Sequence, residues 1–469
     1  MQKQRFIMKV SKLISGLYFT ILFFYMIFGR SFSGIEIFGF RIGEFLIAIC
    51  LIFSFLYFPF KKLKIFKNNF VFDIRIFILS KLFLVSFLLT VLFTSGSFTD
   101  TYTYRSSSII WSINFIFFGY FFFKNLDSEH LFFKVLPFVP IVLYILSTIH
   151  FPEILIDFFT SYSDVFDFVK GSDLLLVFIG TMLFTRNKYK DSYLGFSYFL
   201  IISSLFIPLF IYKSKGAFFP GFLFVIFNLF FFRKFIFKNK FKSLFIVLIS
   251  IFVFLGSTFN SYGNLTFKKA GMDQVTQPDN IIKAVPDAFS YIISEKNTSE
   301  IFFSFFVYKG RLYSQEQMAN WRLQIWQDVV RDLFYYSNYY QDEETYGLVR
   351  EQLERRNDIF ITGFGYNSIL PAMNHWERTG TDGTNENPHN FFIYALGRGG
   401  ILLASLVLCF HTVLIIYWKQ KFNNYQILLF ILPLLFAAAF DAAMESVRFP
   451  FIYYSFIGYL INNNIKKAS

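Results

Sequence analysis

The sequence predicts an all-α polytopic membrane protein of about twelve transmembrane helices, with one large, mainly helical extracytoplasmic loop before the last three spans. Hydrophobic residue types make up 55% of the 469 residues and charged types only 16%, whereas a soluble globular chain carries about 25% charged residues. The apolar residues come in long blocks. The block from Leu244 to Phe254, broken only by Ser250, is apolar on every face, as in a lipid-facing or fully buried helix.

The apolar blocks reach or approach the roughly 20 residues that a bilayer core of about 30 Å requires. They lie near residues 13–30, 42–60, 74–94, 106–123, 131–149, 171–185, 193–212, 216–232, 243–259, 391–417, 425–442 and 449–463. The sixth is short for a full span, which leaves a tilted or re-entrant helix open. No small-residue cleavage site follows the block from Leu13 to Phe28, so we expect a retained first helix rather than a signal peptide. The chain thus divides into 1–259, 260–390 and 391–469.

The charge pattern orients these blocks. A net charge of +13 could suggest nucleic-acid binding, but Lys and Arg form short clusters between apolar blocks, as membrane orientation requires. We therefore expect a lipid bilayer and no nucleic acid as partner. Basic clusters precede the first crossing and follow the second, sixth, eighth, tenth and twelfth, whereas the opposite side carries Asp100, Glu153, Asp157, Asp164, Asp167 and Asp173. Both termini are then cytoplasmic, and residues 260–390 lie outside the cytoplasm.

The outer loop, residues 260–390, is polar and contains no further span. Ser314 to Gln317 resembles a capping box that opens a helix. An amphipathic stripe follows at three- and four-residue spacing, formed by Met318, Trp321, Ile325, Val329 and Leu333. We expect a second, charged helix from Glu343 to Arg356 and a turn at Gly363-Phe364-Gly365; no strand pattern stands out.

Basic groups on the outer side are exceptional, so those present carry information. Lys213-Ser214-Lys215-Gly216 lies between the seventh and eighth crossings. These residues are either lysines that snorkel at helix ends or a phosphate site, where Gly216 lets a backbone N–H come close. Arg322 lies between Trp321 and Trp326. It either anchors an interfacial helix or binds a phosphodiester oxygen pair bidentately.

Two further outer positions combine polar groups with a helix start. His389-Asn390 enters the tenth crossing, where His389 is either a polar cap or a general base near neutral pH. Gly397, Gly399 and Gly400 follow and allow close backbone packing. The last outer connection carries Asp441, Glu445, Arg448 and Pro450. Glu445 and Arg448 form either an ion pair or the wall of a polar cavity.

Other chemistries lack their motifs. His375, Glu377, Asp382, Glu386 and His389 are possible metal ligands but are not at zinc or Asp-rich motif spacing, so no metal is expected. Cys50 and Cys409 lie inside apolar blocks, which argues against a disulfide or a thiolate site. No Walker motif, dinucleotide loop or G-x-S-x-G is present. We expect no cofactor, and on the outer face, where ATP is lacking, the substrate itself must supply the energy.

Taken in order, these residues resemble a known family. Ser-Lys-Gly after the seventh crossing, Arg-x-x-x-Trp early in the loop, Gly-x-Gly, His-Asn entering a Gly-bearing helix and Glu-x-x-x-x-Pro before the last span are similar to the O-antigen polymerase and O-antigen ligase superfamily of bacterial membrane glycosyltransferases. The resemblance covers the whole chain as topology and about ten residues as motif. It implies a bacterial inner membrane, with the large loop in the periplasm.

The resemblance also implies a reaction. A glycan carried on undecaprenyl diphosphate passes to a hydroxyl of an acceptor glycan, without metal or nucleotide sugar. His389 would be the base, and Arg322 and Lys215 would hold the diphosphate. Where this chain has Lys215, the family commonly has Arg. We expect the remaining substrate contacts from Lys213, Asn390, Trp326, Glu445 and Arg448.

Three functions remain open. The preferred one is an O-antigen polymerase, with a chain-length regulator protein as a further partner. An O-antigen ligase would use the same donor but a lipid A core acceptor, and residues after Gly400 depart from the ligase pattern. A lipid-linked glycan flippase is the alternative of another class, because Lys81, Arg41 and Glu44 are ionisable groups within or beside spans. Transporters, however, usually show repeat symmetry and mid-membrane polar sites.

Overall fold

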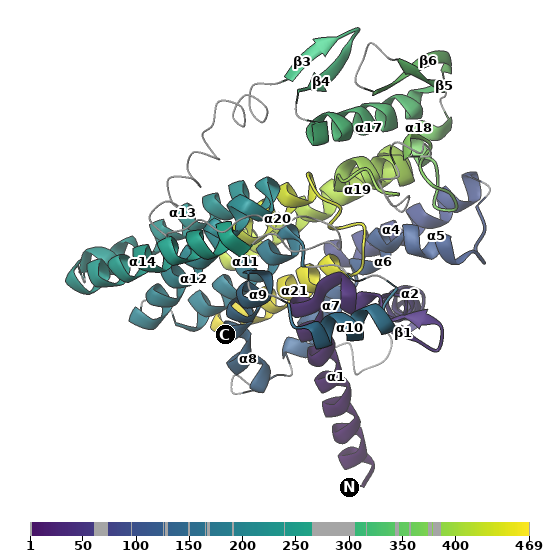
Figure 1. The fold of residues 1–469 in the computed structure, drawn as a ribbon. Coiled ribbons are helices and arrows are strands. Elements are labelled where there is room, and N and C mark those ends of the chain that lie inside the picture. The colour runs from purple at the N-terminus through teal and green to yellow at the C-terminus, as the bar shows by residue number, and fades with distance from the viewer. Residues whose placement is uncertain are drawn as a thin grey trace.

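The computed structural model is a bundle of helices with a smaller group of strands and helices at one end (Figure 1). It describes residues 2–60, 74–94, 96–124, 126, 130–148, 151–164, 166, 169–189, 192–238, 240–264, 305–315, 317–342, 347–355, 358–373, 378 and 386–468. Side chains are described in these ranges except at 2–12, 55–60, 212, 215, 234, 262–264, 317–318, 335–355, 358 and 466–468.

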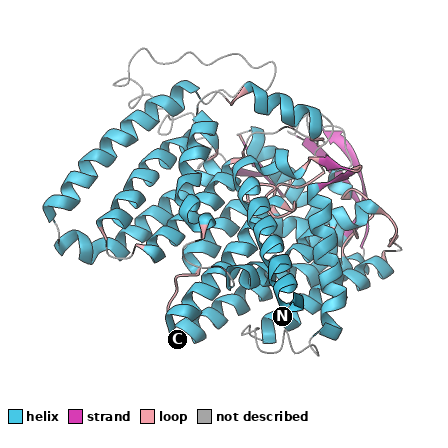
Figure 2. Ribbon diagram, turned by 90° about the horizontal axis from the view of Figure 1, so that it is seen from below, coloured by secondary structure: helices cyan, strands magenta, loops and turns pink. Residues whose placement is uncertain are grey.

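Helices dominate the described part of the chain (Figure 2). The helices are α1 (Gln2–Ser33), α2 (Ile42–Phe60), α4 (Ile74–Phe93), α5 (Thr101–Ser106), α6 (Ser108–Ser112), α7 (Phe115–Lys124), α8 (Leu131–Val135), η1 (Leu136–Phe138), α9 (Val139–Thr148), α10 (Glu153–Tyr162), α11 (Gly171–Lys188), α12 (Tyr193–Lys213), α13 (Lys215–Lys238), α14 (Lys240–Asn264), α17 (Gln317–Phe334), α18 (Asp358–Thr362), η2 (Pro371–Met373), α19 (Phe391–Phe422), α20 (Leu428–Ala438) and α21 (Arg448–Ala468). The strands are β1 (Glu36–Ile37), β2 (Phe40–Arg41), β3 (Phe305–Tyr308), β4 (Arg311–Ser314), β5 (Tyr335–Asp342) and β6 (Gly347–Arg355).

Each apolar block of the sequence contains a helix or a row of short helices. Within the described residues, seven helices are long and apolar enough to cross a membrane: Leu13–Ser33, Ile74–Phe93, Leu131–Thr148, Tyr193–Ile211, Gly216–Arg233, Lys240–Ser261 and Phe391–Phe422. These helices indicate a multi-pass α-helical membrane protein. The full number of twelve spans stays a prediction, since several of the other blocks form shorter or more polar helices.

Helix α11, the short sixth block, is buried in protein rather than in lipid. Every residue from Gly171 to Thr185 is buried, because α9, α12, α13, α20 and α21 pack around it. A helix enclosed in this way can carry polar groups such as Asp173 and Thr181 that a lipid-facing helix would not tolerate. Its low hydropathy in the sequence therefore reflects its central position.

Helices α7 and α21 pack with their backbones nearly in contact. A Cβ atom on Gly119 would lie 2.6 Å from Ser455 Cα, and one on Gly458 would lie 2.4 Å from the Tyr120 nitrogen. Small residues at a crossing permit this approach, which increases van der Waals contact where lipid gives no hydrophobic drive.

The described part of residues 305–378, which we call the outer segment after its predicted location, contains strands that the sequence did not predict. The expected helix from Glu343 to Arg356 is wrong: Gly347–Arg355 is strand β6, antiparallel to β5. Strands β3 and β4 form a second hairpin, with Phe305 opposite Ser314. The tyrosine-rich sequence of β5 favours an extended chain, and cross-strand pairing then overrides the weak helical propensity of its charged partner. Helix α17 was correctly predicted, and Ile325, Val329 and Leu333 of its stripe are fully buried.

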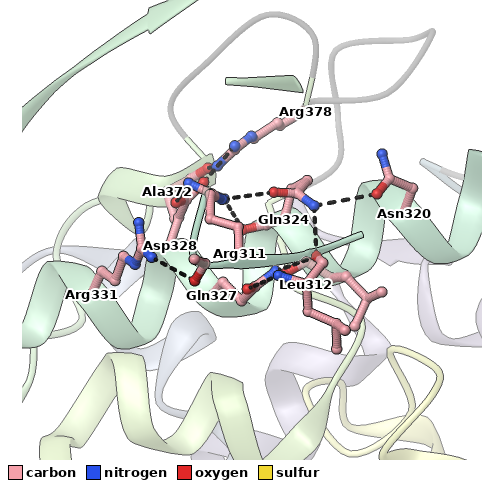
Figure 3. Close-up of polar contacts among 11 residues, drawn as sticks. Arg311, Leu312, Asn320, Gln324, Gln327, Asp328, Arg331, Ala372 and Arg378 are labelled. Atoms are coloured by element: carbon pink, nitrogen blue, oxygen red, sulfur yellow. Dashed lines mark hydrogen bonds and ion pairs between the residues drawn. The ribbon is translucent and has the colours of Figure 1, made fainter. Parts of the chain in front are cut away.

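A buried ionic cluster holds β4 and α17 together (Figure 3). Asp328 binds Arg311 at 2.8 Å and Arg378 at 2.6 Å, and all three side chains are buried. Arg311 also donates to Gln324 Oε1 at 2.9 Å. Breaking a buried pair leaves an uncompensated charge, so this cluster fixes the orientation of α17 on the rest of the outer segment.

The outer segment joins the bundle where α19 is broken. Gly399 and Gly400 leave helical geometry, with Gly400 at φ 61°. The turn at Gly363 fits into this break. The N–H groups of Phe364 and Gly365 donate to the carbonyls of Gly397 and Arg398 at 2.8 and 3.0 Å. The predicted turn at Gly363-Phe364-Gly365 is thereby confirmed, with φ of 70° and 85° at its two glycines.

We predict that Gly400→Ala destabilises this junction. Its Cβ would lie 2.4 Å from the Ile361 carbonyl oxygen, and its positive φ adds strain, for a total cost of about 2 kcal/mol or more. Thermal unfolding of the detergent-purified protein should show a lower Tm. Gly256→Ala is the matched control, because no atom lies within 4 Å of a Cβ at that position; equal Tm values for the two variants would contradict the junction's role.

Candidate functional site

The site begins at the start of α19. Asn390 caps this helix, since its side-chain oxygen accepts from the N–H groups of Phe392 and Ile393 at 3.0 and 3.1 Å. The preceding residue, His389, has a φ of 52°, a left-handed conformation that is uncommon for a residue other than glycine. Strain of this kind gathers at functional sites. The cap is therefore Asn390, and His389 is free of that role.

Helix α17 lies over His389. The rings of Trp321 and His389 meet edge to face with centroids 5.5 Å apart. Trp326 donates its indole N–H to the Pro388 carbonyl at 2.7 Å, which holds the chain directly before the histidine. Arg322, between the two tryptophans, donates from Nη1 to the Phe440 carbonyl at 2.9 Å.

The connection between α20 and α21 forms the other side of the site. Ser172 donates to the Asp441 carboxylate at 2.6 Å, and Arg448 binds Asp173 at 2.9 Å in a buried ion pair. Of the two alternatives for Glu445 and Arg448, the ion pair is absent among the described residues, since Arg448 pairs with Asp173. Both carboxyl oxygens of Glu445 are buried and accept no hydrogen bond from the described residues, because Asp173 on α11 lies nearer to the guanidinium.

The predicted phosphate segment packs onto the same place. Helix α12 ends at Lys213, and Ser214, in an extended conformation, separates it from α13. Ser214 lies against Gly171: a Cβ added to Gly171 would be 2.4 Å from Ser214 Cβ. Gly216 faces Phe440, since a Cβ added to Gly216 would be 3.5 Å from Phe440 Cβ. Lys213 ends α12 next to this break, whereas the Lys215 side chain lies outside the described residues.

Burial and charge keep His389 neutral. Desolvation is the largest cause that lowers its pKa, from 6.5 to about 4. Within this shift, the positive charges of Arg322 and Lys170 also lower the pKa, whereas Asp441 opposes them. At neutral pH the imidazole is therefore unprotonated and has a ring nitrogen available to accept a proton. Its Nδ1 atom is buried without a hydrogen-bond partner among the described residues.

The two nearby carboxyl groups differ in their titration. Burial, with a smaller contribution from the charge of Asp441, raises the pKa of Glu445 from 4.5 to about 8, so Glu445 is mostly protonated at neutral pH. Burial also acts on Asp441, but Lys170, the hydrogen bond from Ser172 and the charge of Arg448 together hold the pKa of Asp441 below its ordinary value. One carboxyl is thus neutral and the other is an anion beside His389.

Several candidates predicted from the sequence do come together. They are His389, Arg322, Trp326, Glu445 and Arg448, and all lie where α17, α19 and the α20–α21 connection meet. An unprotonated imidazole beside a guanidinium can accept a proton from a neutral group while an anion is bound nearby.

Sequence reasoning missed Lys170 and, although it named Asp441 on the last outer connection, gave that residue no role in the site. Lys170 is a basic residue on a side that is otherwise acidic, flanked by Asp164, Asp167 and Asp173. The argument that selected Lys213 and Lys215 applied equally to it. Asp441 could not have been chosen over its neighbours, because only the fold places it beside His389.

Metal ligands do not gather in the part of the chain that the structure describes, where no three His, Cys, Asp or Glu side chains are grouped to hold an ion. His375, Glu377 and Asp382, which the sequence offered as ligand types, lie outside the described residues.

Comparisons of the chain with protein-family models, with curated proteins and with solved structures found no match.

The pKa of His389 provides a test of the site's electrostatics. Arg322→Gln should raise the pKa of His389 above 4, because one positive charge is removed, while burial continues to hold it below 6.5. Asp441→Asn should lower the pKa, because a negative charge is removed. Histidine-labelled protein would be titrated by NMR, with the resonance assigned by His389→Gln. Lys419→Gln, at the far end of α19, should leave the titration unchanged. A wild-type pKa near 6.5 would contradict the arrangement.

Proposed function

We propose that this protein is a membrane glycosyltransferase that polymerises a surface polysaccharide such as O-antigen, joining repeat units carried on undecaprenyl diphosphate. The proposal rests on one observation above all. An unprotonated, buried imidazole, His389, lies beside the guanidinium of Arg322 where α17 meets the start of α19. The sequence motifs that resemble the O-antigen polymerase and ligase superfamily contribute these same two residues.

The reaction is a displacement at the anomeric carbon of the donor glycan. His389 removes the proton from the acceptor hydroxyl as its oxygen bonds to that carbon. The bond from carbon to the phosphate oxygen breaks, and its electron pair leaves with undecaprenyl diphosphate. Arg322 stabilises the negative charge that develops on this leaving group, in a site from which burial excludes much of the water.

Donor binding would strengthen the base. In the free protein, Arg322 is among the causes that hold the pKa of His389 near 4. A diphosphate bound to the guanidinium offsets that positive charge, so the pKa of His389 rises toward neutrality. Asp441 would then stabilise the imidazolium that forms. The acceptor is thereby activated only when the donor is in place.

The proposed setting follows from the charge pattern of the connections. The protein would lie in the bacterial inner membrane with both termini in the cytoplasm and the outer segment in the periplasm. Its partners are the lipid-linked oligosaccharide, an acceptor glycan and a chain-length regulator protein. Protease accessibility of residues 305–355 from the periplasmic side would test this orientation.

His389→Ala should abolish chain extension while protein remains in the membrane and lipid-linked repeats accumulate on the outer side. Loss of a general base typically slows a reaction about a hundred- to ten-thousand-fold. Extension is measured in a deletion strain complemented by each variant. His130→Ala, which removes an imidazole at the start of α8 outside the site, is the matched control. Normal polymer from His389→Ala would refute the mechanism, and accumulation on the cytoplasmic side would favour a flippase.

The lipopolysaccharide ladder of the deletion strain separates polymerase from ligase. Loss of long chains with a single repeat left on the core supports the polymerase. Loss of every repeat from the core supports the ligase, which shares the donor but transfers it to lipid A core.

We predict a bell-shaped pH profile of kcat/KM with limbs near pH 4 and pH 8. The acid limb reflects protonation of His389, whose pKa is about 4. The alkaline limb reflects ionisation of Glu445 with a pKa of about 8, since a new negative charge repels the diphosphate. Glu445→Gln should remove only the alkaline limb. An acid limb near 6.5, or an alkaline limb that persists in Glu445→Gln, would be inconsistent with these assignments.

A further inference from the structure

The short hairpin between α1 and α2 exposes an aromatic side chain at its tip. Strands β1 and β2 are joined by a two-residue turn, Phe38-Gly39. Both turn residues have positive φ, 54° at Phe38 and 79° at Gly39. Turns of this kind favour Asn-Gly, and a positive φ is an outlier for a residue as bulky as phenylalanine. The fold thus holds a phenylalanine at the tip despite backbone strain, and its side chain is 95% exposed.

The two faces of this hairpin differ in polarity. Ile37 lies opposite Phe40, and Glu36 lies opposite Arg41. Because consecutive residues of a strand point to opposite faces, one face is apolar and the other is charged. The charged face is held to the protein, since Arg41 binds Asp164 at 3.0 Å. Ile37 and Phe40 are exposed, so the hairpin presents its apolar face as well as its tip outward.

Helix α10 adds a second exposed apolar stripe beside the hairpin (Figure 1). The two elements are joined by a β-bridge between Ile35 and Ser163. Ile154, Phe158 and Tyr162 recur at four-residue spacing along α10 and therefore lie on one side of it. All three are exposed, Ile154 by 77%. The hairpin and α10 together thus present one apolar surface.

The other sides of α10 face protein and water. Phe159 is buried and packs against Phe28 of α1, with ring centroids 5.1 Å apart. Glu153, Asp157 and Thr160 recur at three- and four-residue spacing and are exposed, which gives the helix a polar side. A helix that is apolar on one exposed side and polar on another fits the membrane interface, with acyl chains on the first side and water on the second.

The exposed apolar surface continues onto α2. Phe45, Ile49 and Ile52 recur along one side of this apolar helix and are exposed. The ring centroid of Phe40 lies 5.9 Å from that of Phe45, so a row of apolar side chains runs from α2 onto the hairpin. The apolar part of α1, which is long enough to cross a membrane, ends at Ser33 directly before the hairpin. The hairpin therefore lies where the chain reaches the boundary of the bilayer.

We propose that these exposed apolar residues anchor the protein in the headgroup region of one leaflet. The anchor consists of Ile37, Phe38, Phe40, Ile154, Phe158 and Tyr162. Its partner is the lipid surface, because aromatic side chains are favoured at membrane–water interfaces and insertion gains free energy from the apolar area that it buries. The inference goes beyond the proposed function and does not depend on it.

The anchor also bears on the depth of the candidate site. Gly29 of α1 leaves helical geometry at φ 52°, and a Cβ added there would lie 3.7 Å from Asp173 Oδ2. Asp173 in turn binds Arg448 of the site. The hairpin follows Gly29 by only a few residues. An anchor in the headgroup region therefore places this part of the site near the headgroups as well.

The experiment measures the depth of nitroxide spin labels on the full-length protein in phosphatidylcholine vesicles. Both native cysteines are first removed by Cys50→Ala and Cys409→Ala, and single labels are then attached through Phe38→Cys or Phe158→Cys. Collision of each label with oxygen, which concentrates among acyl chains, and with a water-soluble nickel chelate gives its depth. Both labels should lie about 5–10 Å below the boundary between headgroups and acyl chains, as interfacial helices do.

Matched positions provide the controls. Thr160→Cys, on the polar side of α10, should collide freely with the nickel chelate. Phe252→Cys, exposed on the apolar helix α14, should collide mainly with oxygen. Ile37→Cys and Tyr162→Cys test the same anchor, and they replace either first label if that label lowers the Tm of the cysteine-free protein.

Two outcomes would overturn the anchor. Labels on the hairpin tip and α10 that meet the nickel chelate as freely as the label at Thr160→Cys would place the surface in water. Labels shielded from both reagents would show that protein, such as a second copy of this chain, covers it. The measurement uses no glycan, so a protein that transfers none can still show the anchor, and an active protein can lack it.

Discussion

The arrangement of this protein depends on one close approach of two backbones. The turn at Gly363 enters the break of α19 at Gly400, where a Cβ on either residue would lie within 2.5 Å of backbone atoms. A broken helix in a membrane protein must find other partners for its freed backbone groups. Here the turn supplies them through the N–H groups of Phe364 and Gly365. The outer segment is thereby joined directly to α19, the helix that His389 and its cap Asn390 precede.

Helix α17 is positioned by the same junction. A Cβ on Gly397 would lie 3.1 Å from Val329, so the buried stripe of α17 packs against the part of α19 that lies just before the break. The ionic cluster around Asp328 then fixes α17 within the outer segment. Trp321 and Arg322 consequently face His389 and Phe440. The position of Arg322 therefore follows from glycines some forty to eighty residues away in sequence.

Burying charged and strained groups at the site lowers the stability of the fold. Buried ion pairs such as Arg448–Asp173 contribute little net free energy of folding, because both charges lose their hydration. His389 adds backbone strain, with a φ of 52°, at a position where such strain costs stability. Glu445 is buried without a hydrogen-bond partner among the described residues. These features destabilise the fold where they occur. Stabilising contacts lie within the bundle, in the close glycine contact of α7 with α21 and in the burial of α11.

The sequence by itself determined the helical membrane class and the positions of the long apolar helices, because burial in lipid requires long apolar blocks. It also determined the amphipathic stripe of α17, because burial of one helix face leaves a periodic pattern. It also identified His389 and Arg322 as exceptional residues. Only the tertiary structure decided that Gly347–Arg355 is a strand, since pairing with Tyr335–Asp342 is a non-local interaction. It alone gave Arg448 the partner Asp173 instead of Glu445 and brought Lys170 and Asp441 to His389. Charged side chains act over a few ångströms, and no local pattern records which distant segment will lie within that range.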